Sequence, residues 1–451
     1  MFRKTKNTVT VTLATAAVLI TAAPALAAVD AETAYVFNTF SFLFNGALVM
    51  WMAAGFAMLE SGLVRSKNTA TICLKNIALY SIAGIMFYLL GYSLMYTDVS
   101  GFIGSFSLFY NPSEAELALL GADEATDALV GAVVDGGYSV ASDWFFQMVF
   151  VATAASIVSG TLAERIKLWP FLIFVVVLTT FIYPIQGSWT WGGGWLAELG
   201  FSDFAGSTIV HSVGGWAAVT GALILGARKG KYGPDGRVNP MPGANLPLAT
   251  LGTFILWLGW FGFNGGSQLA LGSAFDATAM AIVFTNTNLA AAGGVLAAML
   301  MTQALYKKVD LTMALNGALA GLVSITAGPD LTNHMMSIVI GGIGGVLVVI
   351  AVPLLDKLKI DDVVGAISVH LVAGIWGTLA VGIFGSGDLR VQIIGIVAIG
   401  AFVIITSSIV WLALKYTIGI RVSDEDEDLG LDMVELGLEA YPEFGRGSQR
   451  G

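Results

Sequence analysis

The chain has 451 residues, of which 56% are hydrophobic and 12% are charged. Soluble domains carry roughly 25% charged residues, so this composition and its recurrent apolar runs indicate a membrane protein. The net charge of −10 comes mostly from acids in one loop and the C-terminal tail, so it does not indicate a basic partner, and no nucleic-acid partner is predicted. The single cysteine, Cys73, excludes an intramolecular disulfide and a cysteine-based metal site. We expect Cys73 to be a small buried helix residue.

Residues 1–27 have the pattern of a signal peptide. Basic residues occupy positions 3, 4 and 6, a short apolar stretch covers 9–23, and Ala25–Ala27 is a small-x-small cleavage site. The alternative is a retained first helix, which Pro24 would interrupt just before the cleavage site. Removal of this leader would place the mature N-terminus outside the cell.

Eleven apolar segments follow the leader, and they predict an all-α polytopic membrane protein with eleven transmembrane helices. The predicted domains are the signal peptide (1–27), a transmembrane transport domain (28–417) and a cytoplasmic C-terminal tail (418–451). The segments are 34–60, 71–96, 143–163, 168–189, 205–226, 247–263, 275–306, 311–327, 332–355, 364–384 and 390–417.

The distribution of basic residues supports this topology. Three of the 21 Lys and Arg residues lie in the leader, and with the N-terminus outside, 17 of the remaining 18 fall on the cytoplasmic side. Only Arg390 falls outside. The positive-inside rule expects such an excess of Lys and Arg on the cytoplasmic side, so this distribution supports the span count. The outer loop at 97–142 holds seven acidic residues and neither Lys nor Arg. We therefore expect a multi-pass protein of the cell (inner) membrane with a cytoplasmic C-terminus.

An internal repeat surrounds two of the three histidines. DFAGSTIVHSVGG (203–215) and DVVGAISVHLVAG (362–374) share the pattern of an Asp, seven residues, a His, and a short glycine-containing end. The fifth segment enters the membrane from outside and the tenth from inside, so the two copies have opposite orientations. This predicts an inverted repeat that relates spans 1–5 to spans 6–10, with the eleventh span extra.

The spacing within this repeat predicts where the histidines lie. Eight helical residues rise about 12 Å, which approaches the midplane of a core about 30 Å thick from either face. His211 and His370 could therefore meet and share one N–H···N hydrogen bond as neutral imidazoles, whereas Asp203 and Asp362 would accept backbone N–H groups. Ionisable residues inside spans usually mark function, although packing histidines remain the alternative.

Two aromatic and glycine-rich motifs lie at the outer ends of the fourth and sixth segments: WGGGW (191–195) and GWFGFNGGS (259–267). Glycines commonly indicate close helix packing, and tryptophans at a membrane face form interface belts. The functional alternative is a cation site. Trp191 would attract a cation through its ring, and Ser267 would accept a hydrogen bond from it.

The tail begins with an unbroken acidic run, Asp424–Asp428, which alone would indicate a solvated end. The following GLDMVELGLEAY (430–441) contains Leu431, Met433, Leu436 and Leu438, which a purely solvating tail does not need. We expect 430–441 to dock on the cytoplasmic loops, where basic residues are concentrated. A disordered tail is the alternative.

Seven motifs occur in order along residues 35–441: FAMLESGLVRSKN (56–68), FFQMVF (145–150), LAERI (162–166), WGGGW (191–195), DFAGSTIVH (203–211), GWFGFNGGS (259–267) and DDVVGAISVH (361–370). Together they resemble those of the ammonium transporter/Rh family, and specifically of its bacterial ammonium transporters. The resemblance implies an outer ammonium recruitment site of Trp191, Ser267 and Phe150. It implies a gate of Phe150 and Phe263, and a pore lined by His211 and His370. Asp203 resembles the acid that shapes the outer vestibule, and we place Asp362 and Gln147 as further structural residues near the site.

The sequence departs from the family pattern at a few positions. Gly365 stands where an acid is often found, and FFQMVF lacks the small residue common between Gln and Phe. Leu436 and Leu438 replace the usual His and Glu of the tail, which leaves open how the tail couples to a regulator. The family implies a homotrimer with one pore per subunit, and often inhibition by a PII-type regulatory protein at the cytoplasmic face.

The predicted function is ammonium/ammonia transport, without enzyme activity, a cofactor or a metal. Ammonium has about the size of potassium, but it donates four N–H bonds and can lose a proton. Whether the proton stays outside or crosses along the histidines is open. One alternative, an intramembrane metalloenzyme, lacks a third buried His, a Cys set and an HExxH motif. A second alternative is an ammonium sensor, but the tail is short for a folded cytoplasmic output domain. A third is a neutral gas channel of Rh type, and the presence of Trp191 and Ser267 argues against it.

Overall fold

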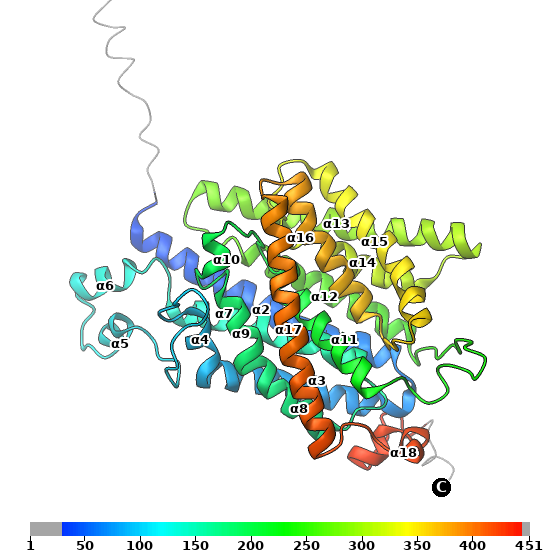
Figure 1. Ribbon diagram of the computed structural model, residues 1–451. Helices are drawn as coiled ribbons and strands as arrows, with labels where there is room; N and C mark the ends of the chain where they lie inside the picture. Colours follow the sequence, from blue (N-terminus) through cyan, green and yellow to red (C-terminus); the bar gives the residue numbers. More distant parts are fainter. Residues whose placement is uncertain (1–28, 444–451) are drawn as a thin grey trace, which may run out of the picture.

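The computed structural model describes residues 29–443, and within that range the chain is all-helical apart from two isolated β-bridges (Figure 1). The predicted leader at 1–27 and the end of the tail at 444–451 lie outside the described residues. The helices are α2 (Ala31–Leu63), α3 (Thr69–Met86), α4 (Tyr92–Tyr96), α5 (Glu114–Leu120), α6 (Asp127–Val134), α7 (Val140–Thr161), α8 (Leu168–Val177), α9 (Tyr183–Ser188), α10 (Trp195–Glu198), α11 (Val213–Leu225), α12 (Leu246–Gly266), α13 (Ala274–Tyr306), α14 (Leu311–Ile325), α15 (His334–Lys357), α16 (Ala373–Phe384), α17 (Leu389–Thr417) and α18 (Asp424–Leu429).

These helices combine into a multi-span membrane bundle. Short π-helical segments connect α3 to α4 and α8 to α9, and others precede α11 and α16. Among the described residues, ten continuous helices are long and apolar enough to cross a bilayer. The remaining predicted segment, 311–327, is the eighth in chain order and forms α14, which is apolar but has only 15 residues. At 1.5 Å per residue it is about 22 Å long, shorter than the hydrocarbon core.

Glycines bring the first helices of the two predicted halves, α2 and α12, into close contact. A Cβ atom added to Gly62 would lie 2.5 Å from the backbone N of Ala249, and one added to Gly252 would lie 2.4 Å from the backbone N of Leu59. Small residues let membrane helices approach until their backbones touch. The glycines of FAMLESGLVRSKN and of α12 therefore determine how closely the two halves pack.

The acidic outer loop carries α5 and α6, which lie at the opposite end of the bundle from α18 (Figure 1). Glu116 of α5 is buried and accepts hydrogen bonds from the backbone N–H of Ser113 and of Val140, both at 2.9 Å. It also accepts one from the Ser139 hydroxyl at 2.6 Å. This loop is thereby attached to the first residues of α7.

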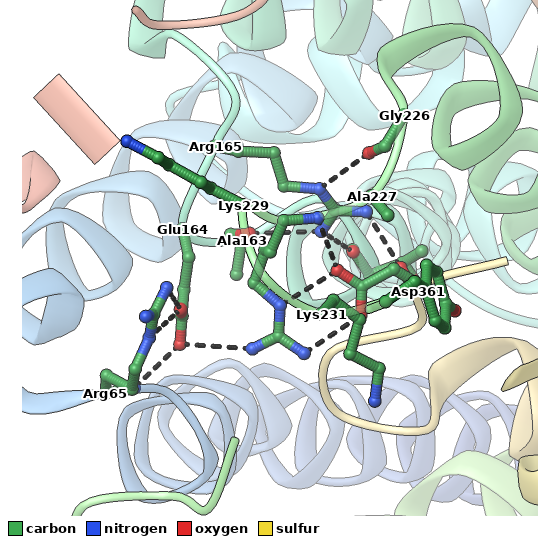
Figure 2. Close-up of polar contacts among 12 residues, drawn as sticks. Arg65, Ala163, Glu164, Arg165, Gly226, Ala227, Lys229, Lys231 and Asp361 are labelled. Atoms are coloured by element: carbon green, nitrogen blue, oxygen red, sulfur yellow. Dashed lines mark hydrogen bonds and ion pairs between the residues drawn. The ribbon is translucent and has the colours of Figure 1, made fainter. Parts of the chain in front are cut away.

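Charged residues of three sequence motifs meet at the other end of the bundle (Figure 2). Glu164 accepts a hydrogen bond from the backbone N–H of Arg65 at 2.8 Å and lies 3.4 Å from the guanidinium of Arg228. Arg228 forms two side-chain hydrogen bonds of 2.9 Å to Asp361, whose backbone carbonyl accepts one from Arg165 at 2.8 Å. The side chains of Glu164 and Asp361 are fully buried. Buried charges require such partners, so this network joins four segments of the chain.

The tail lies against the same end of the bundle. Asp432 accepts hydrogen bonds from the backbone N–H of Ala70 and of Thr71, at 2.9 and 2.8 Å, and so caps the start of α3. Leu431 is buried, and Leu436 packs against the core. Met433 and Leu438, predicted to contribute to docking, are 42% and 51% exposed. The expected contact between 430–441 and the cytoplasmic end thus consists of a capping carboxylate and two of the four apolar side chains.

Two residues of α3 lie on unexpected faces. Cys73 is exposed, so the expectation that it is buried is wrong, because this face of α3 points out of the bundle. Lys75, counted above among the cytoplasmic cations, is 1% exposed. Its ammonium group donates to the carbonyl of Ser159 at 3.0 Å and lies 4.4 Å from the ring centroid of Phe171.

Candidate functional site

Asp203 organises the chain before His211, the first histidine of the repeat. Its buried carboxylate accepts hydrogen bonds from the four backbone N–H groups of residues 206–209, at 2.8 to 3.1 Å. The helix begins at Ser207 rather than at the aspartate, as the spacing argument had assumed. The three residues between Asp203 and Ser207 lie outside the helix. The last of them, Gly206, turns the chain with a φ of 108°, a conformation that is strained for any residue with a side chain.

Asp362 has the same place in the second copy. It accepts hydrogen bonds from the backbone N–H groups of residues 366–368, at 2.8 to 3.4 Å, and from the Thr161 hydroxyl at 2.9 Å. Gly365 occupies the position equivalent to Gly206 and has a φ of 84°. An acidic residue there would be strained, which gives a physical reason for the departure at Gly365. The repeated sequence therefore forms the same local backbone twice.

The two copies bring His211 and His370 together. Their Nδ1 atoms lie 3.2 Å apart, their ring centroids are separated by 5.2 Å, and both side chains are buried. Each histidine lies in a six-residue π-helical segment, Ser207–Ser212 or Ile367–Val372. π-helical turns are frequently found at functional sites because they rotate side chains out of the regular helical register.

A column of aromatic rings continues outward from the histidines. The ring of His211 stacks on Phe263, with centroids 5.2 Å apart, and Phe263 lies against Phe150 with centroids 4.1 Å apart. Both phenylalanines are buried. The predicted gate residues therefore lie in contact, directly outside the histidine pair.

A cavity of about 220 Å³ lies beyond Phe150 and is lined by Trp191, Ser267 and Gln147 among others. The ring of Trp191 meets that of Phe150 edge-on, at 5.9 Å and 84°, and its Nε1 donates to the Asp203 carbonyl at 3.0 Å. Ser267 donates its hydroxyl to the carbonyl of Phe263 at 2.8 Å, so the oxygen of Ser267 can still accept a hydrogen bond. The three predicted recruitment residues thus line one cavity.

Two further cavities lie on the other side of the histidines. A very small one, of about 10 Å³, is lined by His370, Phe56, Glu60 and Asn316. A larger one, of about 330 Å³, also includes Asn316 and reaches Arg228 of the charged network. The histidine pair therefore lies between an outer and an inner cavity, with aromatic rings closing the outer side.

Several side chains of this pathway were not predicted from the sequence. Trp260 stacks on His211 with centroids 4.9 Å apart and donates its Nε1 proton to the Thr326 hydroxyl at 2.8 Å. Phe56 lies 6.0 Å from the ring of His370. Both belong to quoted motifs. Trp260 is one of three aromatic residues in its motif and Phe56 is the only one in FAMLESGLVRSKN, but in each case only the helix packing places the ring beside a histidine.

This arrangement suits a small molecule that can change between a charged and a neutral form. The outer cavity has aromatic faces and oxygen acceptors, which hold cations, whereas the phenylalanine pair provides no polar partner. The imidazoles provide hydrogen-bonding nitrogens within an apolar environment. Among residues 29–443, no group of three or more His, Cys, Asp or Glu residues lies close enough to hold a metal ion.

Comparison with known proteins identifies relatives over nearly the whole chain. The model of the Ammonium Transporter Family matches residues 40–441. The chain is 41% identical over 434 residues to the ammonium transporter Amt2 of Archaeoglobus fulgidus, covering 89% of this chain and 87% of that protein. It is 34% identical over 422 residues to the ammonium transporter of Bacillus subtilis, covering 89% and 97%.

Solved structures have the same fold. One described as a sensor Amt protein aligns with a TM-score of 0.80 and 37% identity, covering 89% of this chain and 99% of that one. The crystal structure of Candida albicans Mep2 aligns with a TM-score of 0.77 and 29% identity, covering 92% of each chain. The predicted all-α polytopic fold and the resemblance inferred from the motifs are both confirmed. The extent of these matches establishes that the chain belongs to the ammonium transporter family.

Proposed function

We propose that this protein moves ammonium or ammonia across the cell membrane through the pathway between the two cavities. The observation that carries the proposal is the contact between His211 and His370, whose Nδ1 atoms lie 3.2 Å apart behind the packed rings of Phe150 and Phe263. The membership of the family and the names of the relatives support the same substrate.

Recruitment takes place in the outer cavity. Ammonium lies against Trp191 and Phe150, whose rings attract cations, and donates a hydrogen bond to Ser267. Such contacts contribute about 0.5–2 kcal/mol each, depending on how far the cation is desolvated. Potassium has a similar size, so recruitment alone does not discriminate between the two ions.

Discrimination takes place at the phenylalanine pair and the histidines. An intact cation that passes Phe150 and Phe263 would lose its partners in a buried apolar environment, at a large cost in free energy. Ammonium can release a proton and pass as ammonia, which hydrogen-bonds to the imidazoles, whereas potassium cannot. Histidine can also relay the released proton, so the pair serves either net ammonia transport or transport of ammonia with a proton.

Reconstituted flux is the decisive experiment. Purified protein in proteoliposomes should give an uptake signal on addition of ammonium, and a simultaneous record of current and internal pH separates the two transported species. A current indicates net charge movement, whereas internal alkalinisation without current indicates ammonia alone. Neither signal, from protein that is correctly inserted, would refute the transport function.

A sensor is the second candidate, because one structural relative is described as a sensor Amt protein. The described part of the tail contains the short α18 and a π-helical turn, Asp432–Leu436, which is small for an output domain. A sensor without transport would bind ammonium but give no flux, so the same experiment separates the two functions. An Rh-type neutral gas channel would lack the saturable cation recruitment expected of Trp191 and Ser267.

The protein functions, in this proposal, as a homotrimer in the inner membrane, with one pore per subunit. The extracellular N-terminus and cytoplasmic C-terminus are supported by the distribution of Lys and Arg. A cysteine introduced at 110–130 should react with an impermeant reagent added outside cells, whereas one at 230–236 should not. Cys73 must be replaced first, because it is exposed. The tail on the cytoplasmic face offers a contact for a PII-type regulator.

A further inference from the structure

Asp143, on the first turn of α7, is a buried acid of the outer cavity with no role in the pathway described above. It precedes Gln147 by four residues, so both side chains lie on the same face of the helix. Asp143 is 8% exposed and lines the 220 Å³ cavity together with Tyr96 and Tyr138. The same cavity is lined by Trp191 and by the other proposed recruitment residues.

Both oxygens of Asp143 accept hydrogen bonds from neutral side chains. The Tyr92 hydroxyl donates to Oδ2 at 2.9 Å, and the Gln147 amide donates to Oδ1 at 3.0 Å. A carboxylate accepts through both oxygens, and each oxygen can still accept a further hydrogen bond beside the donor it already has. Within residues 29–443, no Lys, Arg or His forms an ion pair with it.

Other buried acids of the described chain have stronger compensation. Asp203, Glu116 and Asp432 accept backbone N–H groups, and Asp361, Glu164 and Glu427 form ion pairs with arginines. Glu60 accepts a hydrogen bond from the Ser159 hydroxyl, and Ser159 also binds the buried Lys75 through its carbonyl. Asp143 has neither a backbone donor nor a cationic neighbour of this kind.

A buried carboxylate without a cation is expensive unless something in the cavity neutralises it. We propose that Asp143 is the anionic counter-charge of the outer site and binds the incoming monovalent ammonium cation directly. This inference rests on the proposed transport function and adds a charged residue to its recruitment step. The cation donates one N–H to the carboxylate, at the side of the cavity formed by Tyr96 and Tyr138.

The cavity has room for this additional position. A water molecule occupies about 30 Å³ of the liquid, so 220 Å³ admits several particles of that size. The hydroxyl of Tyr96 is buried and has no hydrogen-bond partner within the described protein, so it can accept a second N–H of the cation. Ammonium therefore binds first beside Asp143 and then moves to Trp191 and Ser267, which lie next to the phenylalanine pair.

Binding measured without transport tests this position separately from the proposed function. The melting temperature of the purified protein should rise with ammonium chloride relative to sodium chloride at equal ionic strength, because a bound ligand stabilises the folded state. Asp143→Asn should weaken the apparent ammonium affinity about ten-fold or more, since it removes a charge-assisted hydrogen bond. Asp127→Asn, which removes an exposed acid of the same outer loop, should leave the affinity unchanged.

A purely structural role for Asp143 would lower the melting temperature in sodium chloride but preserve the ammonium-dependent rise. That result would overturn the inference, and it would leave the transport function intact if flux past the histidines persisted. Should Asp143→Asn fail to fold, wild-type crystals soaked in caesium chloride provide an independent test. A caesium peak within about 4 Å of the Asp143 carboxylate supports the site. A peak beside Trp191 with none at Asp143 refutes it.

Discussion

His211 has two nitrogens in different environments. Its Nδ1 faces the Nδ1 of His370, and its Nε2 is buried without a hydrogen-bond partner in the described protein. Neutral imidazole has one donor and one acceptor nitrogen, so the pair shares a single N–H···N bond and retains nitrogen atoms that can bind ammonia. Stacking on Trp260 and Phe263 holds the ring of His211 in this orientation.

Replacement of either pore histidine by alanine should abolish selective transport or degrade it strongly. The substitution removes half of the hydrogen-bonding pair and enlarges a buried apolar passage. Flux of ammonium and exclusion of potassium would be measured in proteoliposomes. His334→Ala is the matched control, because this third histidine bonds to Asn286 away from the pair. Wild-type rates and potassium exclusion in both His211→Ala and His370→Ala would contradict the pore assignment.

Trp191→Leu or Ser267→Ala should weaken ammonium recruitment more than folding. Loss of a cation–π contact of about 0.5–2 kcal/mol raises the half-saturation concentration by roughly several-fold to tens-fold. The half-saturation concentration for transport is the measurement, with the melting temperature as a check on folding. Trp195→Leu is a suitable control, because Trp195 stacks on Phe102, contacts Trp189 at a tilted angle and does not line the cavity. An unchanged value in the Trp191→Leu/Ser267→Ala double mutant would argue against an outer cation site.

The sequence identified some of these residues and missed others for a physical reason. His211 and His370 are rare ionisable residues inside apolar segments, and the repeat around them indicated that they meet. Trp260 and Asp143 are not distinguishable in this way. Several aromatic residues surround Trp260, and Asp143 stands at the end of a segment where an acid would ordinarily be solvated. Their positions depend on how α7 and α12 pack against the other helices.

At the scale of elements, the starts of the two histidine-bearing helices differ most from expectation. The repeat predicted that each helix begins at its aspartate, but the helices begin at Ser207 and Ile367, after a left-handed glycine. The carboxylates of Asp203 and Asp362 still accept the free N–H groups of the first turn. A one-dimensional spacing cannot distinguish eight helical residues from a short extended approach followed by a π-helical turn.

The contact between the tail and α3 depends on Asp432. Asp432→Asn should release residues 430–441, because it removes the charge that caps the start of α3, an effect of about 0.5–2 kcal/mol. Hydrogen exchange of the 430–441 backbone should increase, and regulator sensitivity should fall where a PII-type protein acts. Glu425→Gln, at an exposed position of the same tail, is the control. Unchanged exchange in Asp432→Asn would indicate that Leu431 and its neighbours hold the tail without the cap.

Across the whole molecule, charge separates the two ends of the bundle. The outer loop carries acids without Lys or Arg, whereas the inner end holds Arg65, Glu164, Arg228 and Asp361 in one buried network. The positive-inside pattern predicted the sidedness of these residues but not their pairing. Arg65 and Arg228 lie 163 positions apart along the chain, yet both pair with Glu164. They can do so only after the helices have assembled.

The network also determines how stability depends on pH. Burial alone would raise the pKa of Asp361, but the hydrogen bonds from Arg228 and the charges of Arg165 and Arg228 outweigh burial and hold this pKa well below its ordinary value. In the unfolded chain the carboxyl group titrates near pH 3.9. The stability contributed by Asp361 is therefore fully present above the unfolded pKa and is lost as the pH falls through the lower folded pKa.

Asp361→Asn should accordingly destabilise the protein at pH 7 and lose its effect in acid. Breaking a buried pair typically costs about 3–5 kcal/mol, because Arg228 keeps its charge without its main partner. Melting temperatures of wild type and mutant in detergent should differ by the same amount from pH 7 down to about pH 4, near the pKa of the unfolded carboxyl group. Below that pH the difference should shrink, because the folded pKa of Asp361 is lower than the unfolded one. Asp356→Asn breaks the less buried pair with Lys231, so it should cost only about 0–1 kcal/mol. A difference for Asp361→Asn that does not shrink below about pH 4 would mean that packing, rather than the carboxylate charge, explains its contribution.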